Sequence, residues 1–377
     1  MKSADVLQVQ DDGALLEMML QDQAAGAAEY RPTNYWARYE QKLVDYFRAY
    51  GLRDFRRAPG GRGDEVLQSF GATDLLDVPE MVARFDYVTP LRGYKRDMAR
   101  YLFWIRRKVV GMEKALGAYR APHGPQRLMY EFTRRQGELC GAEPLEKLSG
   151  SLAGNPEDTM TIDGRNYTPI LLYYYLRYAY TARFFSYSSA PVIVELGSGS
   201  GRQAEIIAKL HPQACLVLFD LAPQLYVCHQ YLKAVFGGAV VDYRESRELP
   251  RLEAAPGRIY VLGTAQFPRI AELARVDLFW NAASMQEMEP AVVENYLSIV
   301  RATASAAYLM EHMGGKEKAQ KAGDAGVLEQ VTLEHYKRGL DGFDLLDLSR
   351  ALVPTGDYND VASDSFWRRG PAATDSH

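Results

Sequence analysis

The chain has 377 residues, a formal net charge of −4 and a hydrophobic fraction of 47%. Its length exceeds the usual size of one domain, and its apolar fraction is ample for a packed core. Because binding of nucleic-acid phosphates depends on clustered positive charge, the acidic balance argues against a nucleic-acid partner.

Cysteine usage and hydropathy indicate the cellular compartment of the protein. The three cysteines do not show the paired spacing of a disulfide framework or a zinc site. The N-terminus lacks the uninterrupted apolar run of a secretory signal. The most membrane-like segment, residues 170–185, is too short to span a bilayer and contains Arg177 and Arg183. We therefore expect a cytoplasmic protein with no membrane partner, in which this segment is a buried helix.

Apolar periodicity predicts a predominantly helical region over residues 1–185. Its first thirty residues are rich in alanine and glutamine, and we expect a loose arm there. Residues 92–108 mix basic and aromatic side chains, which is typical of the solvated face of an amphipathic helix. This region is therefore not expected to bind nucleic acid.

An apolar strand followed by a glycine-rich turn occupies residues 191–201. The β-branched run suits a buried parallel strand, and Gly197, Gly199 and Gly201 let a ligand approach the backbone closely. Apolar residues recur at helical spacing after the turn, so the turn leads into the N-terminus of a helix, which attracts an anionic group. The pattern predicts a nucleotide-type site, although a tight strand-to-helix turn alone would have the same sequence.

The spacing of the glycines separates two kinds of site. A dinucleotide fingerprint needs its third glycine at the position of Arg202, which disfavours a nicotinamide oxidoreductase. The pattern is instead Gly-x-Gly-x-Gly with an acidic residue two positions earlier, and it resembles the first motif of class I S-adenosylmethionine (SAM) methyltransferases. The resemblance implies that the cofactor SAM is bound by Glu195, Gly197, Ser198, Gly199 and Gly201.

A second apolar strand ends in Asp220, nineteen residues after Gly201. Carboxylate oxygens at the C-terminal edge of a strand are well suited to hold a ribose diol. We therefore predict that Asp220 and the following Leu221 contact the ribose. Asp220 could also cap the next helix, near whose first turn Pro223 lies, and the two roles are compatible.

Two further apolar runs, within residues 258–267 and 276–289, lead into polar loops and predict the third and fourth strands of one sheet. The predicted intervening helices cover roughly residues 203–210, 222–235 and 290–303. Residues 263–266 resemble the loop that packs on adenine in small-molecule O-methyltransferases, and Asp277 opens the strand called motif IV there. The cofactor-binding residues predicted in these two loops are Thr264, Ala265, Gln266 and Asn281.

Across most of its length the chain resembles the sugar O-methyltransferases found in bacterial polysaccharide and natural-product gene clusters. The matching pieces are residues 34–36, 55–57, 154–156, 195–201, 286–289 and 365–369. The resemblance implies an α/β fold with a Rossmann-like SAM methyltransferase sheet over residues 186–377, preceded by a helical cap or substrate region over residues 1–185. It implies a sugar or glycosylated small molecule as the methyl acceptor, and it places residues 154–156 near the active site, although a plain turn explains them equally well.

Methylation of a sugar hydroxyl requires a general base to take the proton. Plant-type O-methyltransferases have a catalytic histidine where this chain has Gln286, which cannot act as a base. The neighbouring Glu287 is therefore the first candidate, and His312, after a fifth strand pattern at residues 306–310, is the second. Glu287 could equally stabilise the start of the next helix.

Other possibilities follow from the same residues. Asp277, Glu287 and Glu289 offer oxygen ligands for Mg²⁺, but a strand of about 20–25 Å can separate the first from the others, so no metal is predicted. A SAM-dependent N-methyltransferase acting on a natural-product or amino-acid-like amine would share the cofactor residues without needing a strong base. A SAM-binding protein without catalytic activity would also share them. A homodimer is a candidate assembly.

Overall fold

The computed structural model describes residues 8–57, 124–156, 159–351 and 362–370, with a few isolated residues between 93 and 105. Most of the basic stretch at 92–108 lies outside the described residues. Among the helices within these ranges, none combines the length and the apolar character needed to cross a membrane.

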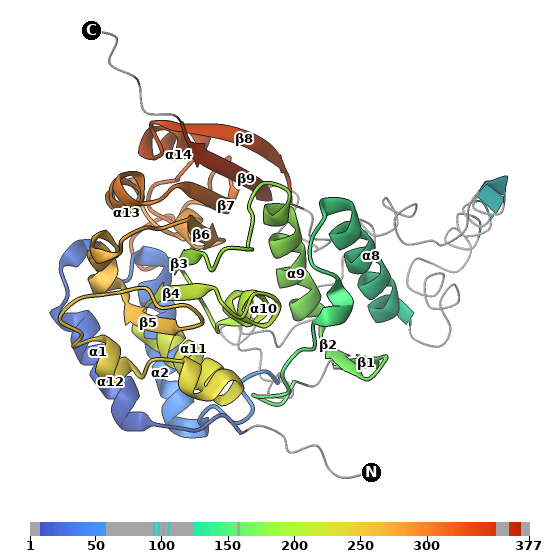
Figure 1. Cartoon of the computed structure of the whole chain (residues 1–377). Coiled ribbons are helices and arrows are strands. Elements are labelled where there is room, and N and C mark those ends of the chain that lie inside the picture. Colours follow the sequence, from blue (N-terminus) through green and yellow to red (C-terminus); the bar gives the residue numbers. More distant parts are fainter. Residues whose placement is uncertain are drawn as a thin grey trace, which may run out of the picture.

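The centre of the molecule is a seven-stranded sheet flanked by helices on both faces (Figure 1). Its strands are β3 (Val192–Leu196), β4 (Cys215–Asp220), β5 (Ile259–Gly263), β6 (Leu278–Ala282), β7 (Ala306–His312), β8 (Phe343–Arg350) and β9 (Ala362–Arg369). They lie in the order β5-β4-β3-β6-β7-β9-β8. The first five of these are parallel, and β9 runs antiparallel to both of its neighbours. This confirms the predicted α/β, Rossmann-like fold class.

Hydrophobic side chains cover both faces of the sheet, because consecutive residues of a strand point to opposite sides. The helices along the sheet are α9 (Pro169–Ala182), α10 (Arg202–Leu210), α11 (Ala222–Phe236), α12 (Tyr243–Ser246), α13 (Pro290–Thr303) and α14 (Leu333–Gly339). Ile193 belongs to the cluster under α9, α10 and α11, whereas Val192 and Val194 belong to the cluster under α13 and α14. The helices predicted before β4, β5 and β7 are thus confirmed, as is the buried helix before β3.

The N-terminal part contains α1 (Gly13–Ala25), α2 (Asn34–Tyr50) and α8 (Gly124–Cys140). Residues 160–167 form a small hairpin of β1 (Met160–Ile162) and β2 (Arg165–Tyr167) within this otherwise mainly helical region. The expectation of a loose arm is wrong for residues 8–30. Asp12 caps α1, and Leu15, Leu16 and Met19 are buried on this helix, which packs along α11. Because the segment is rich in alanine, its sequence pattern did not reveal this apolar face.

Residues 362–369 return to the sheet as β9. Phe366 and Trp367 on β9 are buried, one in each hydrophobic cluster, so that these two aromatics serve as packing residues.

Candidate functional site

The glycine loop connects β3 to α10 and has the backbone that its sequence predicts. Gly197, Gly199 and Gly201 have φ angles of 79°, 55° and 75°, a region that favours glycine. A Cβ on Gly197 would lie 2.4 Å from the hydroxyl oxygen of Ser284, and one on Gly201 would lie 2.9 Å from the side chain of Leu232. The loop therefore lies tightly between the end of β6 and α11, and side chains at Gly197 and Gly201 would displace it.

Asp220 lies at the end of β4, directly beside this loop. Its Oδ2 accepts a hydrogen bond of 2.6 Å from the Gly199 N–H, and its Oδ1 accepts one of 2.7 Å from the Leu221 N–H. Burial raises the pKa of Asp220 to about 7, against the effect of these two backbone donors. The fold thus joins the two motifs that the sequence places nineteen residues apart.

Glu195, the acidic residue that precedes the glycines, is buried at the end of β3. Burial raises its pKa to about 8, although the charge of Arg177 acts in the opposite direction. Arg177 projects from α9, with its guanidinium 4.3 Å from the ring centre of Tyr173 and 4.6 Å from that of Tyr174. Ser198 is also buried.

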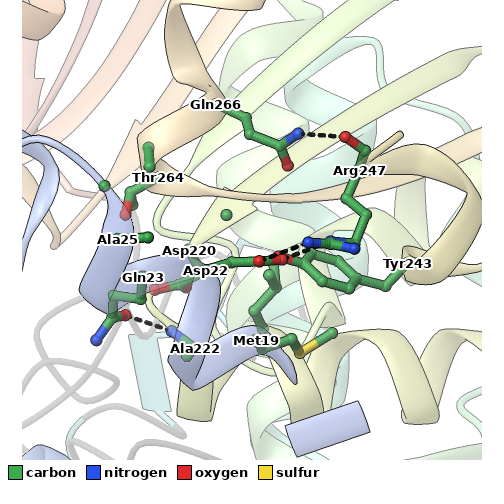
Figure 2. A pocket seen from close by; sticks show the side chains of 14 residues that line it. Met19, Asp22, Gln23, Ala25, Asp220, Ala222, Tyr243, Arg247, Thr264 and Gln266 are labelled. Carbon is green, nitrogen blue, oxygen red and sulfur yellow. Dashed lines mark hydrogen bonds and ion pairs between the residues drawn. The ribbon is translucent and has the colours of Figure 1, made fainter. Parts of the chain in front are cut away.

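A cavity of about 260 Å³ opens between the sheet edge and the N-terminal segment (Figure 2). On the sheet side its lining includes Asp220 and the four residues 263–266. On the other side it is lined by Met19, Asp22, Gln23, Ala25 and Gly26. Residues far apart in the sequence therefore share one cavity at the C-terminal ends of β4 and β5.

The loop after β5 contains three of the predicted cofactor residues. The Thr264 hydroxyl donates a hydrogen bond of 2.7 Å to the Tyr30 carbonyl, and Ala265 lines the cavity. The Gln266 amide donates to the carbonyl of Arg247 at 3.1 Å, while its Oε1 is buried without a hydrogen-bond partner among the described residues. One acceptor at this end of the cavity is therefore unused.

Asn281 is fully buried at the end of β6, and both ends of its side chain are engaged within the protein. Its Nδ2 donates to the Leu196 carbonyl at 2.7 Å, and its Oδ1 accepts from the Met285 N–H at 3.1 Å. Asn281 therefore ties the loop after β6 to the end of β3.

Glu287, the first candidate for the base, lies in a short 3₁₀ helix, η5 (Met285–Glu287). Its side chain is buried, with Oε1 in an ion pair with Lys316 and Oε2 accepting a hydrogen bond of 2.9 Å from the Trp36 indole. Burial raises the pKa of Glu287, and Lys316 and Trp36 partly offset this effect. The ammonium of Lys316 also lies 4.0 Å from the ring centre of Tyr35.

Gln286 joins the two other predicted positions. Its Oε1 accepts a hydrogen bond of 2.7 Å from the backbone N–H of His312, and its own N–H donates to Glu311 Oε2 at 3.0 Å. Gln286 thus holds η5 against the end of β7, so that Glu287 and His312 are carried by adjoining loops. The sequence did not identify Lys316, Arg177 or Glu311, and only the matching motif at residues 34–36 pointed to Trp36.

The carboxylates considered as metal ligands are not brought together. Asp277 lies at the opposite end of β6 from Glu287, where its Oδ2 accepts from the Val192 N–H at 2.7 Å and pairs with Arg275 at 3.1 Å. Within the described ranges, no cluster of three or more histidine, cysteine, aspartate or glutamate side chains could hold a metal ion.

Two of the sequence motifs contact each other away from the cavity. Gly154 and Asn155 have positive φ angles of 78° and 56° in a turn. The Arg56 N–H donates to the Gly154 carbonyl at 3.0 Å, and the Asn155 side chain donates to Asp54 at 2.6 Å. A Cβ on Gly154 would lie 2.3 Å from the Phe55 ring. The turn at residues 154–156 therefore packs against residues 54–56 and is hydrogen-bonded to them.

A scan against protein-family models found no matching family, and a search of curated proteins found no relative. Solved structures with some likeness include a pyocyanin biosynthetic protein, with 14% identity over 94% of this chain and 100% of that chain and a TM-score of 0.36. An O-methyltransferase of neocarzinostatin biosynthesis has 14% identity over 53% of this chain and 56% of that chain, with a TM-score of 0.35. Magnesium protoporphyrin IX methyltransferase from Synechocystis, with bound SAM, has 13% identity over 48% of this chain and 72% of that chain, with a TM-score of 0.32. At TM-scores this low, the likeness supports no conclusion about activity.

Proposed function

We propose that the chain is a SAM-dependent methyltransferase that transfers a methyl group to a hydroxyl of a sugar or glycosylated small molecule. The observation that carries the proposal is the 2.6 Å contact between the Gly199 N–H and the Asp220 carboxylate at the edge of the cavity. It joins a glycine loop at a helix N-terminus to a carboxylate at the next strand end, which suits the two ends of a nucleoside-linked amino acid.

The residues around the cavity fit SAM chemically. Each Asp220 oxygen has one backbone donor and retains capacity to accept from a ribose hydroxyl. The unpartnered Gln266 Oε1 can accept from the exocyclic amine of adenine. Glu195, next to the glycine loop, can hold the ammonium group of the methionine end. Leu221, Thr264 and Ala265 would supply the remaining walls of the site.

The sheet order supports this cofactor over a dinucleotide. The six-stranded dinucleotide-binding sheet has the order 3-2-1-4-5-6 with parallel strands, whereas this sheet places the antiparallel β9 between β7 and β8. Ligands of open α/β sheets bind outside the carboxyl ends of the strands where the order reverses, which here is at β3 and β6. The glycine loop and the Glu287 loop follow these two strands.

The bound cofactor would supply a methyl group on a sulfonium, and the chain would supply position and a proton acceptor. Glu287 is the proposed base, because it is a buried carboxylate at the strand ends whose charge is supported by Lys316. His312 is held beside it through Gln286 and is the second candidate. Residues 1–185 would serve as the cap over residues 186–377, since Trp36 of α2 contacts Glu287.

Calorimetry tests the cofactor. We expect binding of SAM and S-adenosylhomocysteine but not of NAD, and Asp220→Asn should weaken binding of both adenosyl compounds. Asp341→Asn is the matched control, because it removes the same charge at an exposed position outside the cavity. Binding of NAD alone, or equal effects of the two variants, would contradict the proposed cofactor site.

Rates of methyl transfer test which acceptor is used and which residue is the base. The purified protein is incubated with isotope-labelled SAM and a panel of sugars, glycosides and amines, and products are identified by mass spectrometry. With an identified hydroxyl acceptor, Glu287→Gln should lower kcat by about 10²–10⁴-fold. If both Glu287→Gln and His312→Ala leave the rate unchanged, base-assisted O-methylation is excluded. Transfer to amines only would favour an N-methyltransferase, and cofactor binding without turnover on any acceptor would favour a non-catalytic protein.

A further inference from the structure

We infer, building on the proposed function, that helix α1 forms one wall of the cofactor site and that Asp22 is a positioning residue for recognition of the adenine ring. The ligand class selected in this way is a 6-aminopurine nucleoside, as opposed to a 6-oxopurine nucleoside. Neither α1 nor Asp22 belongs to a sequence motif of the site. Both are placed there by the fold.

The wall is built by close contacts between the end of α1 and the loops of the sheet. The Gln23 Oε1 accepts a hydrogen bond of 2.7 Å from the Ala222 N–H, two residues after Asp220. A Cβ on Gly26 would lie 2.6 Å from the Cβ of Ala265, so the lack of a side chain lets the backbone lie against the loop after β5. Met19 lines the cavity from the same helix. The cavity would be open on this side without α1.

Asp22 connects this wall to the loop that carries Arg247 (Figure 2). Its two carboxylate oxygens accept from Arg247 Nε at 2.7 Å and Nη2 at 2.8 Å, in a bidentate pair. The Tyr243 hydroxyl also donates to Asp22 at 2.8 Å. Asp22 and Arg247 are each only 28% exposed, so water competes weakly for this pair and its geometry is specific.

The same arginine fixes the orientation of Gln266. Its backbone carbonyl accepts the hydrogen bond from Gln266 Nε2, which leaves the Gln266 Oε1 as the unused end of the amide. An unused acceptor in a cavity wall complements an amine donor and opposes a carbonyl oxygen. The connection from Asp22 through Arg247 to Gln266 therefore links α1 to the edge of the purine that distinguishes adenine from hypoxanthine.

The test compares two arginines that both pair with aspartates of the N-terminal segment. Arg247 pairs with Asp22 and lines the cavity, whereas Arg244 pairs with Asp12 at 2.9 Å and does not line it. Calorimetry measures the affinity of the full chain for S-adenosylhomocysteine and for its 6-oxo analogue, S-inosylhomocysteine. We expect Arg247→Gln to weaken binding of the adenosyl compound about tenfold and to reduce the preference over the inosyl compound, whereas Arg244→Gln should change neither. Asp22→Asn should reproduce Arg247→Gln.

Four outcomes would overturn the inference. Equal effects of Arg247→Gln and Arg244→Gln would show that both pairs only attach the helix. Unchanged affinities in Arg247→Gln would remove the proposed role while leaving the proposed function intact. Failure of the unaltered protein to bind S-adenosylhomocysteine would contradict the proposed function itself, and with it the wall. If Arg247→Gln does not fold, hydrogen exchange of the unaltered protein decides: ligand should increase the protection of amides in residues 13–25, and unchanged protection would reject the role of α1.

Discussion

The indole N–H of Trp36 donates a hydrogen bond of 2.9 Å to the Glu287 carboxylate, across 251 positions of sequence. The hydroxyl of Thr33 donates to the backbone carbonyl of the same glutamate at 2.9 Å. The start of α2 is thereby attached to the loop after β6 at two points. The N-terminal region therefore shapes the surroundings of the proposed base directly.

This contact predicts a shift in the pH profile. Burial raises the pKa of Glu287, while Lys316 and Trp36 hold it down, so removing either partner should raise the pKa further. A base acts in its ionised form, and the acidic limb of kcat/KM should therefore move to higher pH. We expect a shift of about one pH unit for Lys316→Met and a smaller one for Trp36→Phe. Lys337→Met, which removes an exposed lysine paired with Glu334, is the control. An acidic limb that stays in place in both variants would show that Glu287 is not the titrating group.

Nucleoside binding should depend on pH through Asp220. Burial raises the pKa of Asp220 to about 7, and ribose hydroxyls that donate to it favour the ionised form. The affinity for 5′-methylthioadenosine should therefore fall as pH decreases below about 7, and the decrease should approach tenfold for each pH unit. This ligand lacks the amino-acid end, so Glu195 does not contribute. Calorimetry between pH 5.5 and 8.5 measures the effect, with the pH range set by about 1.5 units on either side of the pKa. Asp220→Asn should bind weakly and without this dependence, and a flat profile for the unaltered protein would refute the ribose contact.

Glu205 on α10 should stabilise the fold strongly. It is fully buried and accepts from the Ser151 N–H at 2.8 Å, Lys209 at 2.7 Å and the Tyr231 hydroxyl at 2.6 Å. Burial alone would raise its pKa, but the charges of Lys209 and Arg202 lower the pKa to about 2. Its contribution is therefore present above the unfolded pKa near 4.5 and is lost as pH falls toward 2. Glu205→Ala should reduce the free energy of unfolding by about 3–5 kcal/mol at neutral pH.

Urea unfolding measures this loss, and Glu334→Ala provides the control because Glu334 pairs with Lys337 at the surface. The control should change stability by less than about 1 kcal/mol. A loss of that small size for Glu205→Ala would mean that its buried network does not stabilise the chain.

Glu311 should make stability depend on pH in the opposite direction to Glu205. Its side chain is fully buried on β7, and its Oε1 has no hydrogen-bond partner among the residues described. Burial raises its pKa to about 8, so the folded state binds the proton more tightly than the unfolded chain, whose pKa is near 4.5. Its stabilising effect is complete below pH 4.5 and is lost as pH rises to about 8. Glu311→Gln should make the slope of unfolding free energy against pH less negative, by up to about 1.4 kcal/mol per pH unit in this interval. An unchanged slope in urea titrations would show that Glu311 ionises normally in the fold.

The sequence predicted the parts of the site that depend on local pattern. The glycine loop, Asp220 and the helices after β3, β4 and β6 are each encoded within a few consecutive residues, as turn glycines, a strand-ending carboxylate or apolar periodicity. The expectation of one sheet followed from the alternation of these segments. Contacts between distant segments could not be predicted in this way.

Lys316 and Asp22 illustrate the limit. A lysine in a loop and an aspartate in an alanine-rich helix have no distinguishing pattern, and their partners Glu287 and Arg247 lie 29 and 225 positions away. Only the packing of α1 along α11 makes Asp22 part of a cavity. The apolar face of α1 was too short to distinguish from a loose, alanine-rich arm.

β9 lies between β7 and β8 in the sheet but follows both of them in the sequence, so the sheet can be completed only after β9 has been synthesised. β7 and β8 have no ladder with each other, because β9 lies between them and pairs with both. On a ribosome, β8 would emerge before any neighbouring strand exists for it, and β7 would keep one edge open until residues 362–369 follow. Exposed strand edges promote pairing between chains, so the nascent protein is prone to such pairing until β9 has taken its place between β7 and β8.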